Sequence, residues 1–133
     1  MLVQRLDHVN IITDRLAETA RFYADVLDLE ERDGPAPLRP DQVRWMYDAG
    51  GNAILHLNSV DCPRAFDRAV TPGSETGAIH QVALRREDFA EITARLDALG
   101  CDYRVNDLSS VGLKQIFTAD PNNVLLELNF FGA

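Results

Sequence analysis

The chain has 133 residues, of which 46% are apolar and 26% charged, and its formal net charge is -8. This length suits one domain that can bury a core without disulfide or metal staples. The acidic balance argues against a nucleic-acid surface, because such binding needs basic residues to neutralise phosphates, and the longest basic cluster is Arg85-Arg86. No apolar run approaches the roughly 20 residues that span a membrane, so we expect a small-molecule partner.

The sequence also favours a cytoplasmic protein. Its first residues, MLVQRLDHVNIIT, lack the basic segment, apolar stretch and cleavage site of a secretory signal. Cys62 and Cys101 form no CxxC pair and are too few for a disulfide framework. We therefore expect both cysteines to be reduced thiols.

In chain order, the first half reads as a strand, a helix and three strands. The strand is expected at about residues 7–11. The helix, with Asp14 as its expected N-cap, is indicated by apolar residues at the spacing of one helical face: Leu16, Ala20, Tyr23 and Leu27. Short β-prone runs follow at about residues 29–32, 43–47 and 53–57.

The second half repeats this order. A strand at about residues 79–84 precedes a helix whose apolar face is formed by Phe89, Ile92, Leu96 and Leu99, with Gly100 at its C-terminal end. Further strands are expected at about residues 103–105, 113–118 and 124–130. Turn signals at Asp48-Ala49-Gly50-Gly51 and Asp120-Pro121-Asn122-Asn123 separate the last two strands of each half.

The two halves are copies of one unit. Residues 52–58 read NAILHLN and residues 123–129 read NVLLELN, an offset of about 70 residues that also places His80 opposite His8. We predict one domain over residues 1–133, an α+β fold in which two βαβββ repeats form curved mixed sheets around a metal cleft. The repeat units cover about residues 1–60 and 74–133, and residues 61–73 form either a linker or part of a lid.

Four side chains of the repeat are predicted to hold one divalent metal ion: His8, His56, His80 and Glu127. Side chains alternate along a strand, so His8 faces away from the helix-packing side, and each of the other three lies on a first or last strand of its unit. A single histidine is more often a core or surface residue bonded to backbone. Here, however, all three histidines of the chain fall at repeat-equivalent positions, with a carboxylate in the fourth.

The ligand set leaves the metal open. Imidazole nitrogen and carboxylate oxygen suit zinc, nickel, iron, cobalt or manganese. A six-coordinate ion would keep two positions for water or substrate, which is a catalytic arrangement. A closed tetrahedral structural site is the competing geometry, although structural zinc usually favours cysteine.

These residues resemble the vicinal oxygen chelate superfamily, which includes glyoxalase I, type I extradiol dioxygenases, fosfomycin-resistance thiol transferases and bleomycin-binding proteins. The resemblance covers the whole chain and rests on LDHVNI, FYADVLDL, ILHLN, IHQVAL and ADPNNVLLELNF. The last is similar to a family turn in which Asn122 replaces the usual glycine, a tolerable change because asparagine accepts left-handed conformations.

The resemblance implies metal ligands at His8, His56, His80 and Glu127, and a homodimer whose sites are shared between subunits. It also implies a glyoxalase I-like lyase or isomerase that works through a metal-bound enediolate or oxyanion. Glu127 would move the proton. His56 occupies a position where glyoxalase I sites typically carry a carboxylate, so only one glutamate remains for this role. A metal-bound hydroxide is therefore a second candidate base.

Three alternatives remain open. An extradiol-type Fe(II) dioxygenase would use His8, His80 and Glu127, with His56 as an acid/base group or extra ligand. Thiol transfer to an epoxide uses a similar set. A binding or resistance protein without catalysis generally lacks these ligands. Substrate choice is expected to come from loops 33–42 and 59–77, with Trp45, Asn10, Asn58 and Asn129 as further residues that could line the cleft or orient ligands.

Overall fold

The computed structural model describes residues 2–132. Met1 and Ala133, which the predicted domain includes, lie outside the described residues. The chain divides into two compact units, residues 1–73 and residues 74–133. The segment 61–73 contains no helix or strand and belongs to the first unit.

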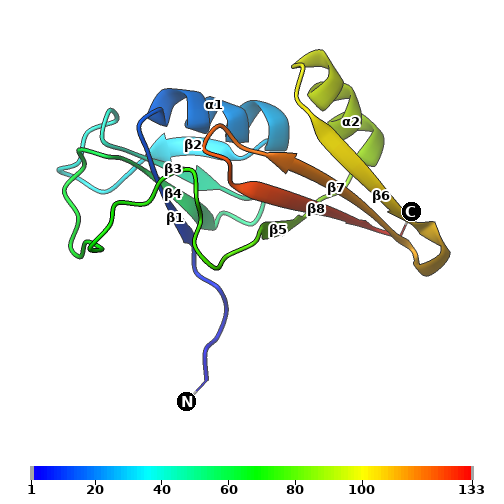
Figure 1. Cartoon of the computed structure of the whole chain (residues 1–133), viewed down its shortest axis with the longest axis horizontal. Helices are drawn as coiled ribbons and strands as arrows, with labels where there is room; N and C mark the ends of the chain where they lie inside the picture. The colour runs from blue at the N-terminus through cyan, green and yellow to red at the C-terminus, as the bar shows by residue number, and fades with distance from the viewer. Residues whose placement is uncertain (1, 133) are drawn as a thin grey trace. The chain divides into compact units, whose positions relative to one another are not determined.

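Unit 1 is a four-stranded sheet covered by one helix (Figure 1). Its elements are β1 (Val9–Thr13), α1 (Leu16–Leu27), β2 (Glu30–Asp33), β3 (Val43–Tyr47) and β4 (Ala53–Ser59). The strand order is β1-β4-β3-β2, with β1 parallel to β4 and the other pairs antiparallel. The core contains Tyr23 of α1 together with Met46 and Leu57 of the sheet, all fully buried.

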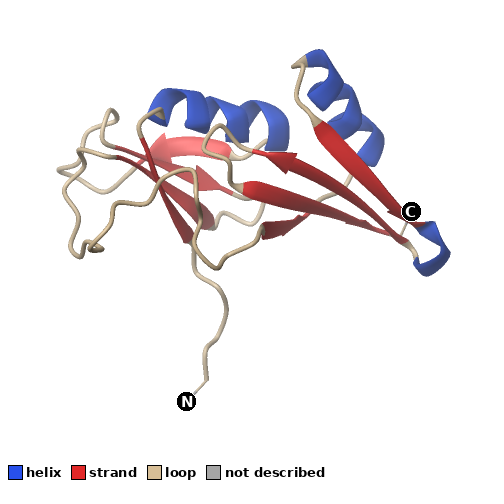
Figure 2. Ribbon diagram, in the orientation of Figure 1, coloured by secondary structure: helices blue, strands red, loops and turns tan. Residues whose placement is uncertain are grey.

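Unit 2 has the same plan (Figure 2). Its elements are β5 (Val82–Arg85), α2 (Phe89–Ala98), β6 (Tyr103–Leu108), the 3₁₀ turn η1 (Ser109–Val111), β7 (Leu113–Ala119) and β8 (Leu125–Phe131). The strand order is β5-β8-β7-β6, and β5 is parallel to β8. Ile92 and Leu96 of α2 are fully buried, and the Phe89 ring meets Phe130 of β8 edge to face at 5.3 Å.

The predicted fold class is confirmed: an α+β protein with two βαβββ units, each built on a mixed sheet. Parallel pairing of the first and last strands matters for function, because it brings the start and the end of each unit side by side. Within residues 2–132, none of the helices is both long and apolar enough to cross a membrane.

The predicted turns before β4 and β8 are the same structure in both units. Asp48 and Asp120 each accept hydrogen bonds on Oδ1 from two backbone N–H groups at 2.7–3.0 Å. Each turn contains one left-handed residue, Gly51 (φ 79°) in the first and Asn123 (φ 65°) in the second. The prediction that Asn122 stands in for the usual glycine is wrong by one position, because the left-handed residue is Asn123.

The start of α1 also differs from the prediction. The N-cap residue is Arg15 and not Asp14, and the Arg15 side chain makes no capping hydrogen bond. Thr13 at the end of β1 instead accepts the backbone N–H of Arg15 on Oγ1, at 3.0 Å. At the end of α2 the prediction is confirmed, because Gly100 follows the last helical turn with φ 67°.

Candidate metal site

In unit 1 the structure brings two of the predicted ligands into contact. His8 immediately precedes β1, and His56 lies on β4, the parallel neighbour of β1. Their ring centroids are 3.7 Å apart and the ring planes differ by 13°. Trp45, directly across from His56 on β3, stacks on the other face of that ring at 4.0 Å. The three rings therefore form one stack on the sheet face opposite α1.

Both histidines of this stack can offer a nitrogen lone pair. His8 Nδ1 lies 2.7 Å from Asp7 Oδ1, and since an ionised carboxylate only accepts, this contact selects the neutral tautomer that has its proton on Nδ1 and its lone pair on Nε2. This hydrogen bond lowers the pKa of Asp7. Burial is the main cause that lowers the pKa of His56 below its ordinary value, which favours the neutral imidazole.

In unit 2 the glutamate is held by two amides. Glu127 on β8 accepts a hydrogen bond on Oε1 from Gln81 Nε2 and one on Oε2 from Asn129 Nδ2, both at 2.9 Å. His80 contacts this group only indirectly, with Nδ1 3.1 Å from Gln81 Oε1. These two donors fix the orientation of the carboxylate.

Strand register identifies the true repeat partner of His8. Asn10 of β1 pairs with His56 of β4, while Ala83 of β5 pairs with Glu127 of β8. If His56 corresponds to Glu127, then Asn10 corresponds to Ala83. His8 therefore corresponds to Gln81, since His8 lies two residues before Asn10 and Gln81 lies two residues before Ala83.

The predicted pairing of His8 with His80 is thus wrong by one residue. Aligning the two histidines ignores the following valines, Val9 and Val82, which are the first residues of β1 and β5. Placing valine over valine in HVNI and QVAL would have revealed Gln81 from the sequence. Gln81 is the residue equivalent to His8 in unit 2, and the sequence analysis did not single it out.

The donor set fits a divalent metal ion, but no single unit supplies a whole site. Among residues 2–132, no group of three or more His, Cys, Asp or Glu side chains lies close enough to hold a metal. Unit 1 presents two imidazoles, and unit 2 presents a carboxylate with the amide oxygen of Gln81 beside it. Imidazole lone pairs lie in the ring plane, so the nearly parallel rings of His8 and His56 would have to leave their stack to meet at one ion.

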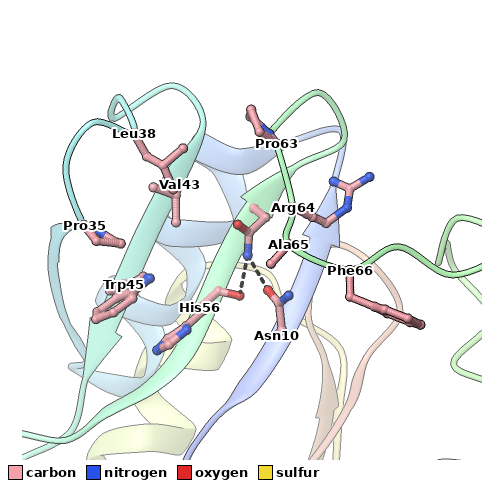
Figure 3. A pocket seen from close by; sticks show the side chains of 11 residues that line it. Asn10, Pro35, Leu38, Val43, Trp45, His56, Pro63, Arg64, Ala65 and Phe66 are labelled. Carbon is pink, nitrogen blue, oxygen red and sulfur yellow. Dashed lines mark hydrogen bonds between the residues drawn. The ribbon is translucent and has the colours of Figure 1, made fainter.

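Beside His56, unit 1 contains an open cavity of about 300 Å³ (Figure 3). Its polar floor is formed by Asn10, Asn58 and His56. Its walls come from β3 and from the two loops expected to set specificity, and consist of Pro35, Leu38, Val43, Trp45, Pro63, Arg64, Ala65 and Phe66. Residues of both loops that are expected to set substrate choice therefore line this cavity.

Residues 5–128 match the family model of the Glyoxalase/Bleomycin resistance protein/Dioxygenase superfamily. The chain belongs to this superfamily. The resemblance to the vicinal oxygen chelate proteins is therefore confirmed at the level of the family. No curated protein shows a significant sequence match to the chain.

Solved structures share the fold at low identity. A protein from the mobile metagenome of V. pseudocholerae has a TM-score of 0.73 and 12% identity, covering 100% of this chain and 98% of its own. Lactoylglutathione lyase from Agrobacterium tumefaciens has a TM-score of 0.66 and 21% identity, with 96% and 94% covered. A glutamate-to-glutamine variant of the fosfomycin resistance protein FosX from Listeria monocytogenes, complexed with Mn(II) and 1S,2S-dihydroxypropylphosphonic acid, has a TM-score of 0.70 and 18% identity, with 98% and 94% covered.

Proposed function

We propose that the protein is a divalent-metal-dependent enzyme that acts on a small oxygen-bearing substrate as a glyoxalase-like lyase or isomerase. The observation that carries this proposal is the matched placement of donors: His8 and His56 in unit 1, Gln81 and Glu127 at the register-equivalent positions of unit 2. Family membership supports the same reading. The cytoplasm is the proposed compartment.

The proposed ligands are His8, His56 and Glu127, with the amide oxygen of Gln81 at the position that the sequence analysis assigned to His80. A bound dication would act as a Lewis acid that stabilises negative charge developing on substrate oxygen. His80 then acts through its contact with Gln81, which it helps to orient.

Glu127 is the proposed proton acceptor. Its two amide partners hold the carboxylate in one orientation and leave it able to accept a proton from a carbon or oxygen placed beside it. His56 is the second candidate for moving a proton, because its ring lines the cavity of unit 1 and also stacks on His8. Trp45 fixes the plane of this ring by stacking on it.

Because each unit presents only half of the donor set, we also propose a homodimer in which unit 1 of one copy and unit 2 of the other complete each site. Homo-oligomers with twofold symmetry form two equivalent sites in this way. Exposed apolar side chains outside the cavity, including Leu2, Val3 and Phe131, are compatible with such an interface.

The test is metal analysis followed by assay. Protein purified without added metal should contain a divalent ion, and it should convert the hemithioacetal that methylglyoxal forms with 2-mercaptoethanol, a small uncharged thiol, when reloaded with nickel or zinc. Ring cleavage of catechols by the Fe(II)-loaded protein, without lyase activity, would replace the proposal by the dioxygenase alternative. An absence of metal binding with all four side chains intact would favour the non-catalytic binding protein.

A further inference from the structure

The cavity beside His56 has a polar floor with hydrogen-bonding capacity to spare. Asn58 Nδ2 donates to Asn10 Oδ1 and, at 3.5 Å, to the backbone oxygen of His56. Within residues 2–132, neither Asn58 Oδ1 nor Asn10 Nδ2 has another partner. The amide pair therefore offers a ligand one acceptor and one donor, and turning both amides over leaves that count unchanged.

The walls of the cavity are largely apolar. Leu38 and Val43 come from the β2–β3 loop and β3, and Pro63 and Ala65 from the loop after β4. In Figure 3 these side chains stand around Asn10 and His56, whereas the Phe66 ring points away. The apolar part of a ligand bound here would lie between the two loops, and its polar end would contact the side-chain amides of Asn10 and Asn58.

The cavity offers no uncommitted charge. Arg64 is its lining cation, and that side chain is only 13% exposed. Its Nε and Nη2 donate to Asp67, and its Nη1 lies within 3.1–3.5 Å of three backbone carbonyl oxygens of the same loop. Arg64 thus holds its own loop together, and an anionic ligand would lose hydration without gaining a counter-charge from unit 1.

From these three features we infer that the cavity selects uncharged, largely apolar hydroxycarbonyl compounds and rejects carboxylates and phosphonates of similar size. The carbonyl of such a compound accepts from Asn10 and its hydroxyl donates to Asn58, next to His56. A volume of about 300 Å³ lies at the small end of ligand cavities, which limits the ligand to a compact molecule. The inference rests on the proposed function, since it names the substrate class of the same site.

The experiment compares 2-hydroxyacetophenone with mandelate, which carries a similar ring and hydroxyl group but is an anion. Metal-free protein in EDTA is titrated with each compound and followed by NMR. We expect 2-hydroxyacetophenone to shift the side-chain amide signals of Asn10 and Asn58 and the Trp45 indole signal. Mandelate should bind at least about tenfold more weakly. Equal or tighter binding of mandelate, or shifts confined to other residues, would overturn the inference.

Two variants separate the contributions of floor and wall. Asn10 is exposed, so the Asn10→Ala variant should fold normally, and its affinity for 2-hydroxyacetophenone should fall several-fold. The matched control Asn106→Ala on β6 should leave that affinity unchanged. Leu38→Arg should reverse the preference toward mandelate by supplying a free cation. If Asn10→Ala binds like the wild type, the assigned floor is wrong.

The outcome is distinguishable from that of the proposed function. If the protein takes up metal but the titrations fail, the substrate class is wrong and the metal enzyme stands. If 2-hydroxyacetophenone binds as described but no metal is taken up, the cavity stands and the metal-dependent function fails.

Discussion

At the scale of single residues, the proposed site depends on the fixed orientation of the Glu127 carboxylate. Gln81 and Asn129 each donate to one of its oxygens, so the carboxylate is oriented before any ion or substrate arrives. A ligand held in one orientation loses less entropy on binding than one that must be ordered first. The proposed metal binding by unit 2 therefore depends on this arrangement, and not on His80.

This account separates two neighbouring residues. Gln81→Ala should lower metal affinity by about 10- to 100-fold, because it removes both an oxygen donor and an orienting partner of Glu127. His80→Ala should change affinity by less than about threefold, since the hydrogen bond of the His80 ring goes to Gln81 and not to Glu127. Isothermal titration of both variants with Ni²⁺ or Zn²⁺ measures the difference. A larger loss for His80→Ala would restore His80 as the ligand.

At the scale of elements, the last hairpin of each unit was predicted closely, whereas the limits of the first strand were not. The runs that become β4 and β8 alternate apolar and polar residues after strong turn signals, which fixes both their position and their facing side. No turn signal directly precedes β1, and the Pro72-Gly73 and Gly77 signals before β5 lie several residues ahead of its first residue. Their limits are set by parallel pairing with a strand some 45 residues away, which a single sequence does not display.

The same reasoning explains what the sequence revealed about the site. His56 and Glu127 lie in the well-defined hairpins, and the prediction that they are equivalent agrees with the strand register. His80 lies before β5, where an alignment error of one residue paired His8 with His80 and not with Gln81. The sequence predicted the two loops that line the cavity but not the cavity itself, because its walls depend on how those loops fold over β3 and β4.

The turn before β4 provides a stability prediction. Gly51 has φ 79°, a conformation that strains any residue with a Cβ, although a Cβ there would meet no neighbour within 4 Å. Gly51→Ala should therefore lower the free energy of unfolding by about 1 kcal/mol. Gly73→Ala is the matched control, because its added Cβ is equally free of neighbours and its φ is not positive. Urea denaturation of both variants tests this, and equal stabilities would show that the turn is not strained.

At the scale of the whole molecule, the proposal that two copies share each site can be tested by mixing inactive variants. His56→Ala damages unit 1 and Glu127→Ala damages unit 2, so neither homodimer has an intact site. If sites are shared between copies, a heterodimer contains one intact site, and refolding an equal mixture should recover about one quarter of the wild-type metal content. If each chain builds its own site, the mixture should recover none.

The central claim is that side chains from both units bind one divalent metal ion, and direct titration of the wild-type protein with Mn²⁺, followed by electron paramagnetic resonance, tests it most directly. We expect one ion per chain, with binding lost in Glu127→Ala and unchanged in Glu75→Ala, an exposed glutamate of unit 2 outside the site. Full binding by Glu127→Ala, or none by the wild type, would contradict the account.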